Sequence, residues 1–202
     1  FFGFQGGGHA YLQERWQDKE NSVLSGTQPR PLDGSRFLTT TFGREAAAFV
    51  QRHPNRPWFL YTAFNAPHMP MTMPPGYEDK VKHIENPNRA RCVAMMMNLD
   101  DAVGEILGAL RATGQEERTL IVFLSDNGGT GTPGNFIKNA SLNVPYRGVK
   151  GDVYEGGMRE PFVVQWKDRL PAGRTYDAPV ISLDLLPTAD PLGAPRWEGS
   201  AA

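Results

Sequence analysis

Three short apolar runs, at residues 58–64, 120–124 and 161–166, predict buried strands. Each run is rich in aromatic or branched apolar residues and is bounded by charged residues, glycine or proline, which is typical of strands. Pro67 and Pro70 follow the first run and prevent it from continuing, because proline cannot donate a hydrogen bond to a neighbouring strand.

Two other stretches carry apolar residues at the spacing of an α-helix. The first covers residues 37–53, is closed by Pro54, and has its apolar positions at Phe42, Ala46, Phe49 and Val50. The second begins at Asn86 and Pro87, an N-cap followed by proline at the first helical position, and Gly114 is placed to end it. Its apolar stripe consists of Met96, Leu99, Val103, Ile106 and Leu110.

The order strand, helix, strand, loop, strand is typical of parallel βαβ units with helices packed over the sheet. We therefore expect an α/β fold in which the strands at 58–64 and 120–124 run parallel and end at the same edge of the sheet. Residues 1–36, rich in glycine, serine, proline and charge, are expected to be irregular, and a short helix is expected from Ser182.

Composition excludes several functional classes. A net charge of −1, with Lys and Arg spread along the chain, gives no electrostatic footprint for nucleic acid. No apolar run approaches the roughly 20 residues of a membrane-spanning helix. The single cysteine, Cys92, excludes an internal disulfide and is expected to be a buried apolar residue. The chain starts at Phe1 without a basic segment, so we expect no signal peptide and a fragment of a longer protein.

The strand at 120–124 leads into the most informative motif, Ser125-Asp126-Asn127-Gly128-Gly129. Asp126 and Asn127 offer hard oxygen donors, which suit Ca²⁺ or Mg²⁺ better than Zn²⁺. The two glycines allow a sharp turn and the close approach of a ligand. The alternative is an ordinary Asp-Asn-Gly turn without a ligand.

Two further groups are candidates for the same sheet edge. His68 lies just beyond the first strand, with Asn65 before it, and the flanking prolines hold it stiffly. Lys150, between glycines, can supply a positive charge for an anionic group. Each also has a simpler interpretation: His68 as an ordinary loop histidine, and Lys150 as a solvated surface lysine. Glu155 and Arg159 are interpreted as a structural ion pair that holds the glycine-rich loop.

A metal carboxylate, a histidine and a lysine on successive loops make a site for hydrolysis of an anionic ester. Metal and lysine would neutralise a charged oxyanion, and the histidine could protonate a leaving oxygen.

The chain resembles the formylglycine-dependent sulfatases of the alkaline phosphatase superfamily. Phe59–His68 is similar to the family block FLYLAFNAPH, and residues 99–104 and 119–129 resemble the next two blocks in the right order. Residues 147–159 are similar to the RGGKGxxYEGGxR loop, and residues 177–188 to the APVxxxDLLPT stretch. The resemblance covers residues 37–188 and implies an alkaline-phosphatase-like fold with a mixed, mostly parallel sheet and flanking helices, lacking its N-terminal half.

The resemblance implies a role for each matching residue. Asp126 and Asn127 match two ligands of a divalent cation, usually Ca²⁺. His68 matches the histidine that contacts the sulfate ester and assists the leaving group, and Lys150 matches the lysine that binds a sulfate oxygen. His9 lies where some members place a substrate-contacting residue.

The family nucleophile, a formylglycine made within a Cys/Ser-x-Pro-x-Arg motif, has no counterpart here. The paired aspartates that complete the metal site are also absent. We therefore expect residues 1–202 to be part of a sulfatase catalytic domain, inactive alone, with the nucleophile upstream. The remaining strands are expected to expose apolar faces and to be poorly stable in isolation.

Two alternatives to a sulfatase acting on a small-molecule or glycan sulfate ester stay open at this point. One is a phosphodiester or phosphonate monoester hydrolase of the same superfamily, and the other is a non-catalytic, carbohydrate-binding relative. The family resemblance implies a periplasmic or secreted protein. The oligomeric state is not encoded in any feature of the sequence.

Overall fold

The computed structural model describes residues 1–6, 8–12, 22–30, 36–131 and 141–189. They fall into two compact units, divided between Leu170 and Pro171. The first unit carries the predicted site residues.

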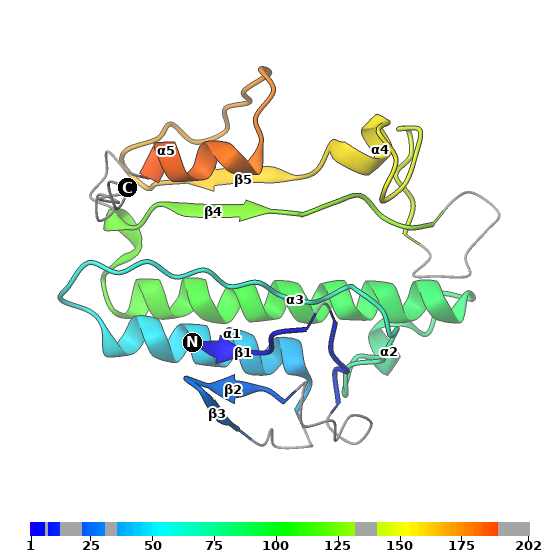
Figure 1. The fold of residues 1–202 in the computed structure, drawn as a ribbon, viewed down its shortest axis with the longest axis horizontal. Helices are drawn as coiled ribbons and strands as arrows, with labels where there is room; N and C mark the ends of the chain where they lie inside the picture. The colour runs from blue at the N-terminus through cyan, green and yellow to red at the C-terminus, as the bar shows by residue number, and fades with distance from the viewer. Residues whose placement is uncertain (7, 13–21, 31–35, 132–140, 190–202) are drawn as a thin grey trace, which may run out of the picture. The chain divides into compact units, whose positions relative to one another are not determined.

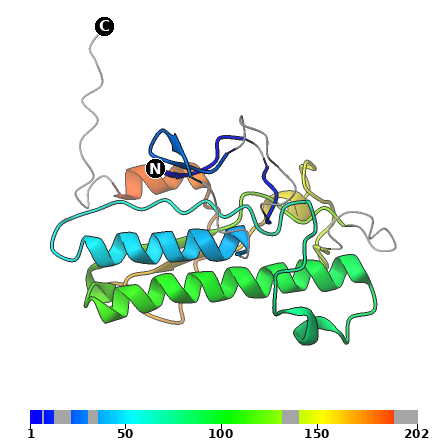
Figure 2. The ribbon, with the colours of Figure 1, turned by 90° about the horizontal axis from the view of Figure 1, so that it is seen from below.

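Two long helices, α1 (Leu38–Arg52) and α3 (Pro87–Ala112), lie side by side at the centre of the first unit (Figures 1 and 2). Both helices are confirmed, as is the predicted start of the second. The Asn86 side chain accepts hydrogen bonds from the backbone N–H groups of Asn88 and Arg89, at 3.0 and 2.9 Å. The helices approach closely because Gly43 has no side chain: a Cβ there would lie 2.7 Å from that of Ala102.

The helices bury their facing sides in two clusters. Tyr11, Phe37, Leu38, Phe42, Met95 and Leu99 belong to the first cluster, and Ala47, Val50, Ala109 and Leu110 form the second. The predicted stripe on α3 is correct at Leu99 and Leu110 but wrong at Met96, which is exposed while Met95 is fully buried. Cys92 is buried, as predicted. The short α2 (Glu78–Val81) packs beside α3.

The described part of residues 1–36 includes a small antiparallel sheet of three two-residue strands, β1 (Phe2–Gly3), β2 (Leu24–Ser25) and β3 (Gln28–Pro29). Phe2 and Phe4 pack on Phe42 of α1, with ring centroids 5.9 and 6.1 Å apart. The N-terminal segment is thereby anchored to the helices.

The segment at 58–64 is not the strand that the sequence predicts. It runs along the helices (the cyan trace in Figure 1), and no described residue pairs with its backbone. Its exposure still alternates as in a strand. Trp58 and Leu60 pack on the second helical cluster, whereas Phe59 and Tyr61 are 83% and 79% exposed.

The strand pair β4 (Ile121–Leu124) and β5 (Phe162–Gln165) is antiparallel, with Leu124 opposite Phe162. The two strands appear where they were predicted. The expected parallel arrangement of the strands at 58–64 and 120–124 does not occur, because the segment at 58–64 forms no strand. Parallel neighbours are usually joined through a helix that crosses the sheet, and between β4 and β5 the described residues contain only the four-residue α4 (Glu155–Met158). The short turn η3 (Glu116–Arg118) connects α3 to β4.

The predicted exposure of apolar strand faces is confirmed: Phe123, Val163 and Val164 are all exposed. None of the helices among the described residues has the length and apolar character needed to cross a membrane. In the second unit, η4 (Ser182–Asp184) and α5 (Leu185–Ala189) form the short helix predicted from Ser182.

Candidate functional site

His68 lies in a turn, residues 65–70, which we call the histidine turn. The side chain of the buried Tyr11 holds this turn, because its hydroxyl lies 2.7 Å from the carbonyl oxygen of Asn65 and 2.8 Å from that of His68. The Tyr11 ring stacks on Phe37 at 4.7 Å. Burial raises the pKa of the Tyr11 hydroxyl above its usual range, so the hydroxyl keeps its proton and acts as a donor.

The His68 side chain is exposed, and its Nδ1 lies 2.9 Å from the carbonyl oxygen of Met69. A carbonyl only accepts, so this hydrogen bond requires a proton on Nδ1 and leaves Nε2 available to a ligand. The backbone of Gly8 also approaches the ring: a Cβ there would lie 3.9 Å from its Cε1 and Nδ1 atoms.

His9, the second candidate on this side, is buried. Its Nδ1 lies 2.6 Å from the carbonyl oxygen of Ala10, and its ring packs on Phe4 at 5.0 Å. These contacts give His9 a structural role beside the histidine turn, and its substrate contact stays a prediction. The Asn65 Oδ1 atom is buried and has no hydrogen-bond partner among the described residues.

Asp126 and Asn127 follow β4 in a second turn, residues 126–129, the carboxylate turn. Among the described residues Asp126 makes no hydrogen bond or ion pair, and its side chain is exposed. Asn127 donates from Nδ2 to the carbonyl oxygen of Gly128 at 3.0 Å, which leaves its Oδ1 oxygen uncommitted. The pair therefore presents oxygen donors of the kind that Ca²⁺ and Mg²⁺ take.

The loop that carries Lys150, residues 146–152, is the lysine loop. It is hydrogen-bonded directly to the carboxylate turn, because the backbone N–H of Lys150 donates to the carbonyl oxygen of Gly129 at 3.0 Å. A second bond joins Gly128 N–H to the carbonyl oxygen of Gly157 at 3.2 Å. The structure therefore brings the predicted metal ligands and the loop of the predicted lysine together.

Gly128 is needed for this close approach. A Cβ at Gly128 would lie only 1.9 Å from the carbonyl oxygen of Gly156, so any other residue would push the two loops apart. The sequence predicted that this glycine makes room for a ligand. In the structure it makes room for the neighbouring loop.

Glu160 is a site residue that the sequence reasoning missed. Its Oε1 atom lies 3.0 Å from the position of a Cβ at Gly128, and burial together with the charge of Asp126 raises the pKa of its carboxyl group. Glu160 precedes β5, which pairs antiparallel with β4, so the start of β5 meets the end of β4. A β5 that ran parallel to β4 would have placed Glu160 at the opposite edge.

Contacts within the glycine-rich loop, residues 147–159, stabilise it. The predicted ion pair between Glu155 and Arg159 is confirmed, with Arg159 Nη1 3.3 Å from Glu155 Oε2, although both side chains are largely exposed. The Arg147 guanidinium lies over the Tyr154 ring, 3.9 Å from its centroid. These contacts hold the loop against itself and leave Lys150 without a described ion-pair partner.

A family model described as Sulfatase matches residues 2–192. The chain belongs to the sulfatase family. It is 30% identical to the uncharacterized sulfatase YdeN of Escherichia coli K12 over 192 residues, and 34% identical to human arylsulfatase A over 170 residues. These alignments cover 94% and 83% of this chain but 32% and 31% of the relatives. The chain thus spans about a third of the length of these two curated relatives.

The similarity to a solved structure, together with the match to the sulfatase family, confirms the expected alkaline-phosphatase-like α/β fold. The structure of Ps i-CgsB in complex with k-i-k-neocarrahexaose superposes with a TM-score of 0.85 at 32% identity. The match covers 95% of this chain and 44% of that chain.

The candidate site residues occur in two groups in this chain. Asp126, Asn127, Glu160 and the lysine loop form one group, and His68 with His9 and Asn65 forms the other. Within the described residues, no hydrogen bond or ion pair joins the two groups. In the same part of the chain, no three His, Cys, Asp or Glu side chains cluster so that they could hold a metal ion.

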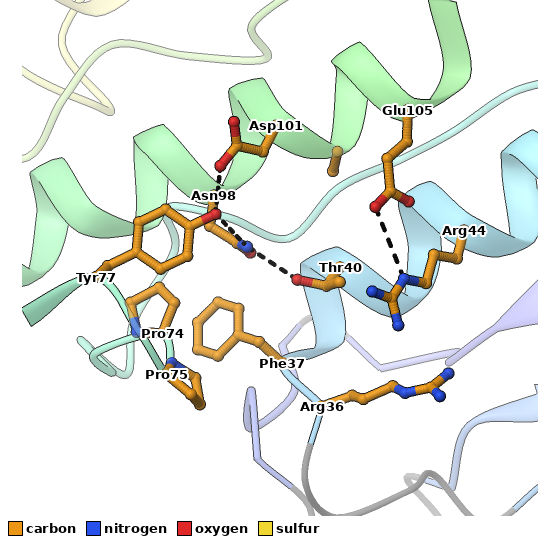
Figure 3. A pocket seen from close by; sticks show the side chains of 11 residues that line it. Arg36, Phe37, Thr40, Arg44, Pro74, Pro75, Tyr77, Asn98, Asp101 and Glu105 are labelled. Atoms are coloured by element: carbon orange, nitrogen blue, oxygen red, sulfur yellow. Dashed lines mark hydrogen bonds and ion pairs between the residues drawn. The ribbon is translucent and has the colours of Figure 1, made fainter. Parts of the chain in front are cut away.

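A hollow of about 280 Å³ lies elsewhere, between α1, α3 and the loop before α2 (Figure 3). Its polar groups bond one another: Tyr77 donates to Asp101 at 2.5 Å, and Asn98 donates to Thr40 at 2.8 Å. Arg44 and Glu105 lie 3.7 Å apart across its rim. None of the predicted sulfatase residues lines it, and its paired side chains fit a structural role.

Proposed function

We propose that this chain is part of the catalytic domain of a sulfatase, which hydrolyses the sulfate ester of a small molecule or a glycan. The observation that carries the proposal is the junction at the carboxyl end of β4. There the carboxylate turn and the lysine loop are hydrogen-bonded through Gly129, so oxygen donors for a cation and a positive charge for an anion belong to one assembly. Membership of the sulfatase family supports this reaction class.

Asp126 and Asn127 are the residues proposed to hold a divalent cation, Ca²⁺ or, alternatively, Mg²⁺. Their uncommitted oxygens fit such an ion. Two ligands are fewer than the six to eight oxygens that Ca²⁺ takes, so further donors must come from other residues, water or substrate. When bound, the cation supplies positive charge beside the sulfate oxygens.

Lys150 and His68 are proposed to act on the ester itself. The Lys150 ammonium would bind a sulfate oxygen and oppose the negative charge that grows during cleavage. His68, held by its Nδ1 bond to Met69, would present Nε2 to the leaving oxygen and donate a proton when the ring is protonated. His9 would contribute a substrate contact only if its local bond to Ala10 opens.

The nucleophile is proposed to come from outside these residues. No Cys/Ser-x-Pro-x-Arg sequence occurs in the 202 residues, so the formylglycine expected for the family must be supplied by another segment of the whole protein. We expect the chain by itself to be inactive. The oligosaccharide bound to Ps i-CgsB supports a sulfated glycan as the substrate class.

The direct test compares sulfate and phosphate release by the whole protein from aryl sulfate, aryl phosphate and a sulfated oligosaccharide. We expect sulfate release to dominate and to fall at least about 100-fold in Lys150→Met, because a charge that stabilises the transition state is removed. Lys82→Met is the matched control. Lys82 is the C-cap residue of α2, and its exposed side chain pairs with Asp79 of the same helix. Faster phosphate release would favour the phosphoesterase alternative, and no release of either would favour a binding protein.

A further inference from the structure

Asn143 makes more hydrogen bonds to the site than any residue predicted from the sequence. Its Oδ1 accepts from the backbone N–H of Gly129 at 2.9 Å. Its Nδ2 donates to the carbonyl oxygens of Gly129 and Gly148, both at 3.0 Å. One side-chain amide thus bonds both backbone groups of a glycine in the carboxylate turn and a carbonyl of the lysine loop.

These bonds lie at positions that matter for the proposed chemistry. Gly129 is two residues after Asn127, and Gly148 is two residues before Lys150. The carbonyl oxygen of Gly129 also accepts the backbone N–H of Lys150, so Asn143 and Lys150 share one acceptor. Any shift of the Asn143 amide would therefore move the backbone of both segments.

The chemistry of asparagine suits this position. Its amide offers a donor and an acceptor side by side, matching the C=O and N–H groups of a peptide. A carboxylate of the same shape only accepts, so it would lose both bonds to carbonyl oxygens, and glutamine would reach one carbon further. Serine and alanine are too short to bridge the two loops.

We propose that Asn143 is a positioning residue that fixes the lysine loop against the carboxylate turn, so that Lys150 and a cation held by Asp126 and Asn127 would contact the same anion. This inference rests on the proposed sulfatase function, because it assigns Asn143 through the sulfate contact of Lys150. Asn143 acts through these groups and makes no contact with the ester. Its removal should therefore reduce what Lys150 contributes more than it unfolds the domain.

A double-mutant cycle in the whole protein tests the proposal, with inorganic sulfate as the probe and its dissociation constant measured by calorimetry in Ca²⁺. In the unmodified background, Lys150→Met should weaken sulfate binding about tenfold, because a hydrogen bond to a charged group is lost. In the Asn143→Ala background the same change should weaken it only about twofold, because a misplaced lysine contributes little. Equal effects of Lys150→Met in both backgrounds would overturn the proposal.

Two controls keep a structural effect apart from positioning. Asn98→Ala removes another asparagine, one that is buried in α3 and bonded to Thr40 and Tyr77. It should lower stability while leaving the tenfold effect of Lys150→Met unchanged. If Asn143→Ala does not fold, Asn143→Ser takes its place in the cycle with the same expectation.

The two proposals fail in different ways. A whole protein that neither binds sulfate nor releases it from an ester contradicts the sulfatase function and this inference with it. A protein that does both, but in which Lys150→Met has the same effect with and without Asn143, contradicts the role of Asn143 alone.

Discussion

The helical layer and the strand segments of this chain differ in how completely they are buried. Helices α1 and α3 bury their facing sides against each other and against the N-terminal segment. The segment at 58–64 covers one apolar face and exposes the other, and in β5 the neighbouring Val163 and Val164, which point to opposite faces, are both exposed. A strand buried on both faces has a continuous apolar sequence, and these runs have that sequence but are only partly buried. The helices therefore account for the stability of the unit, and the strand ends carry the proposed chemistry.

The largest expected effect lies in the helical layer and uses two neighbouring methionines. Met95 is fully buried in the first cluster, whereas Met96 is 43% exposed. Met95→Ala should lower the free energy of unfolding by about 2–5 kcal/mol, because it leaves a cavity. Met96→Ala should change it by less than about 0.5 kcal/mol. Urea unfolding of both variants measures the difference, and equal effects would contradict the assignment of the buried face.

The next largest effect is expected at Tyr11, which connects the helical layer to the histidine turn. Tyr11→Phe removes the hydroxyl that lies within hydrogen-bonding distance of the carbonyl oxygens of Asn65 and His68. We expect a loss of about 1–3 kcal/mol, because the part-buried carbonyl of His68 loses its donor and that of Asn65 keeps only the backbone N–H of His68. Hydrogen exchange should also become faster at the His68 amide and stay unchanged in α3. Unchanged exchange at His68 would show that Tyr11 does not hold the histidine turn.

These two regions also show what the sequence could and could not predict. The helices were predictable because spacing and capping are local: Asn86 and Pro87 start α3 where expected. Strand pairing was not, because partner and direction depend on connections across the chain. The antiparallel pairing of β5 therefore places Glu160 beside Asp126, which the sequence did not predict. Asn143 was also missed, because nothing in its neighbouring residues indicates three hydrogen bonds to two loops.

A smaller effect is expected at Glu160. Burial and the charge of Asp126 raise the pKa of its carboxyl group, so ionised Glu160 destabilises the folded chain at neutral pH in the absence of metal. The folded state then binds protons more tightly than the unfolded state, and stability falls as pH rises from the ordinary glutamate pKa through the raised one.

Glu160→Gln removes this dependence. The variant should be more stable than the unmodified chain at pH 7, by less than about 1 kcal/mol because solvent screens the partly exposed group. The difference should vanish at pH 4, where Glu160 is protonated. Thermal unfolding at both pH values measures it, and a variant that is less stable at pH 7 would contradict the repulsion.

The smallest effect on stability is expected on the exposed face of the segment at 58–64. Tyr61→Lys should leave the free energy of unfolding almost unchanged and reduce self-association, because it places a charge on an exposed apolar edge. Leu60→Lys, one residue earlier but packed on the second helical cluster, should destabilise the chain. Light scattering and urea unfolding distinguish the two faces, and similar behaviour of both variants would refute the alternation.

The most direct test of the central claim is a crystal structure of the whole protein with Ca²⁺ and inorganic sulfate. The account predicts Ca²⁺ bound by oxygens of Asp126 and Asn127 at about 2.3–2.6 Å. It also predicts one sulfate within hydrogen-bonding distance of both Lys150 Nζ and His68 Nε2. A sulfate bound at Lys150 with His68 beyond reach, or a cation held elsewhere, would contradict it.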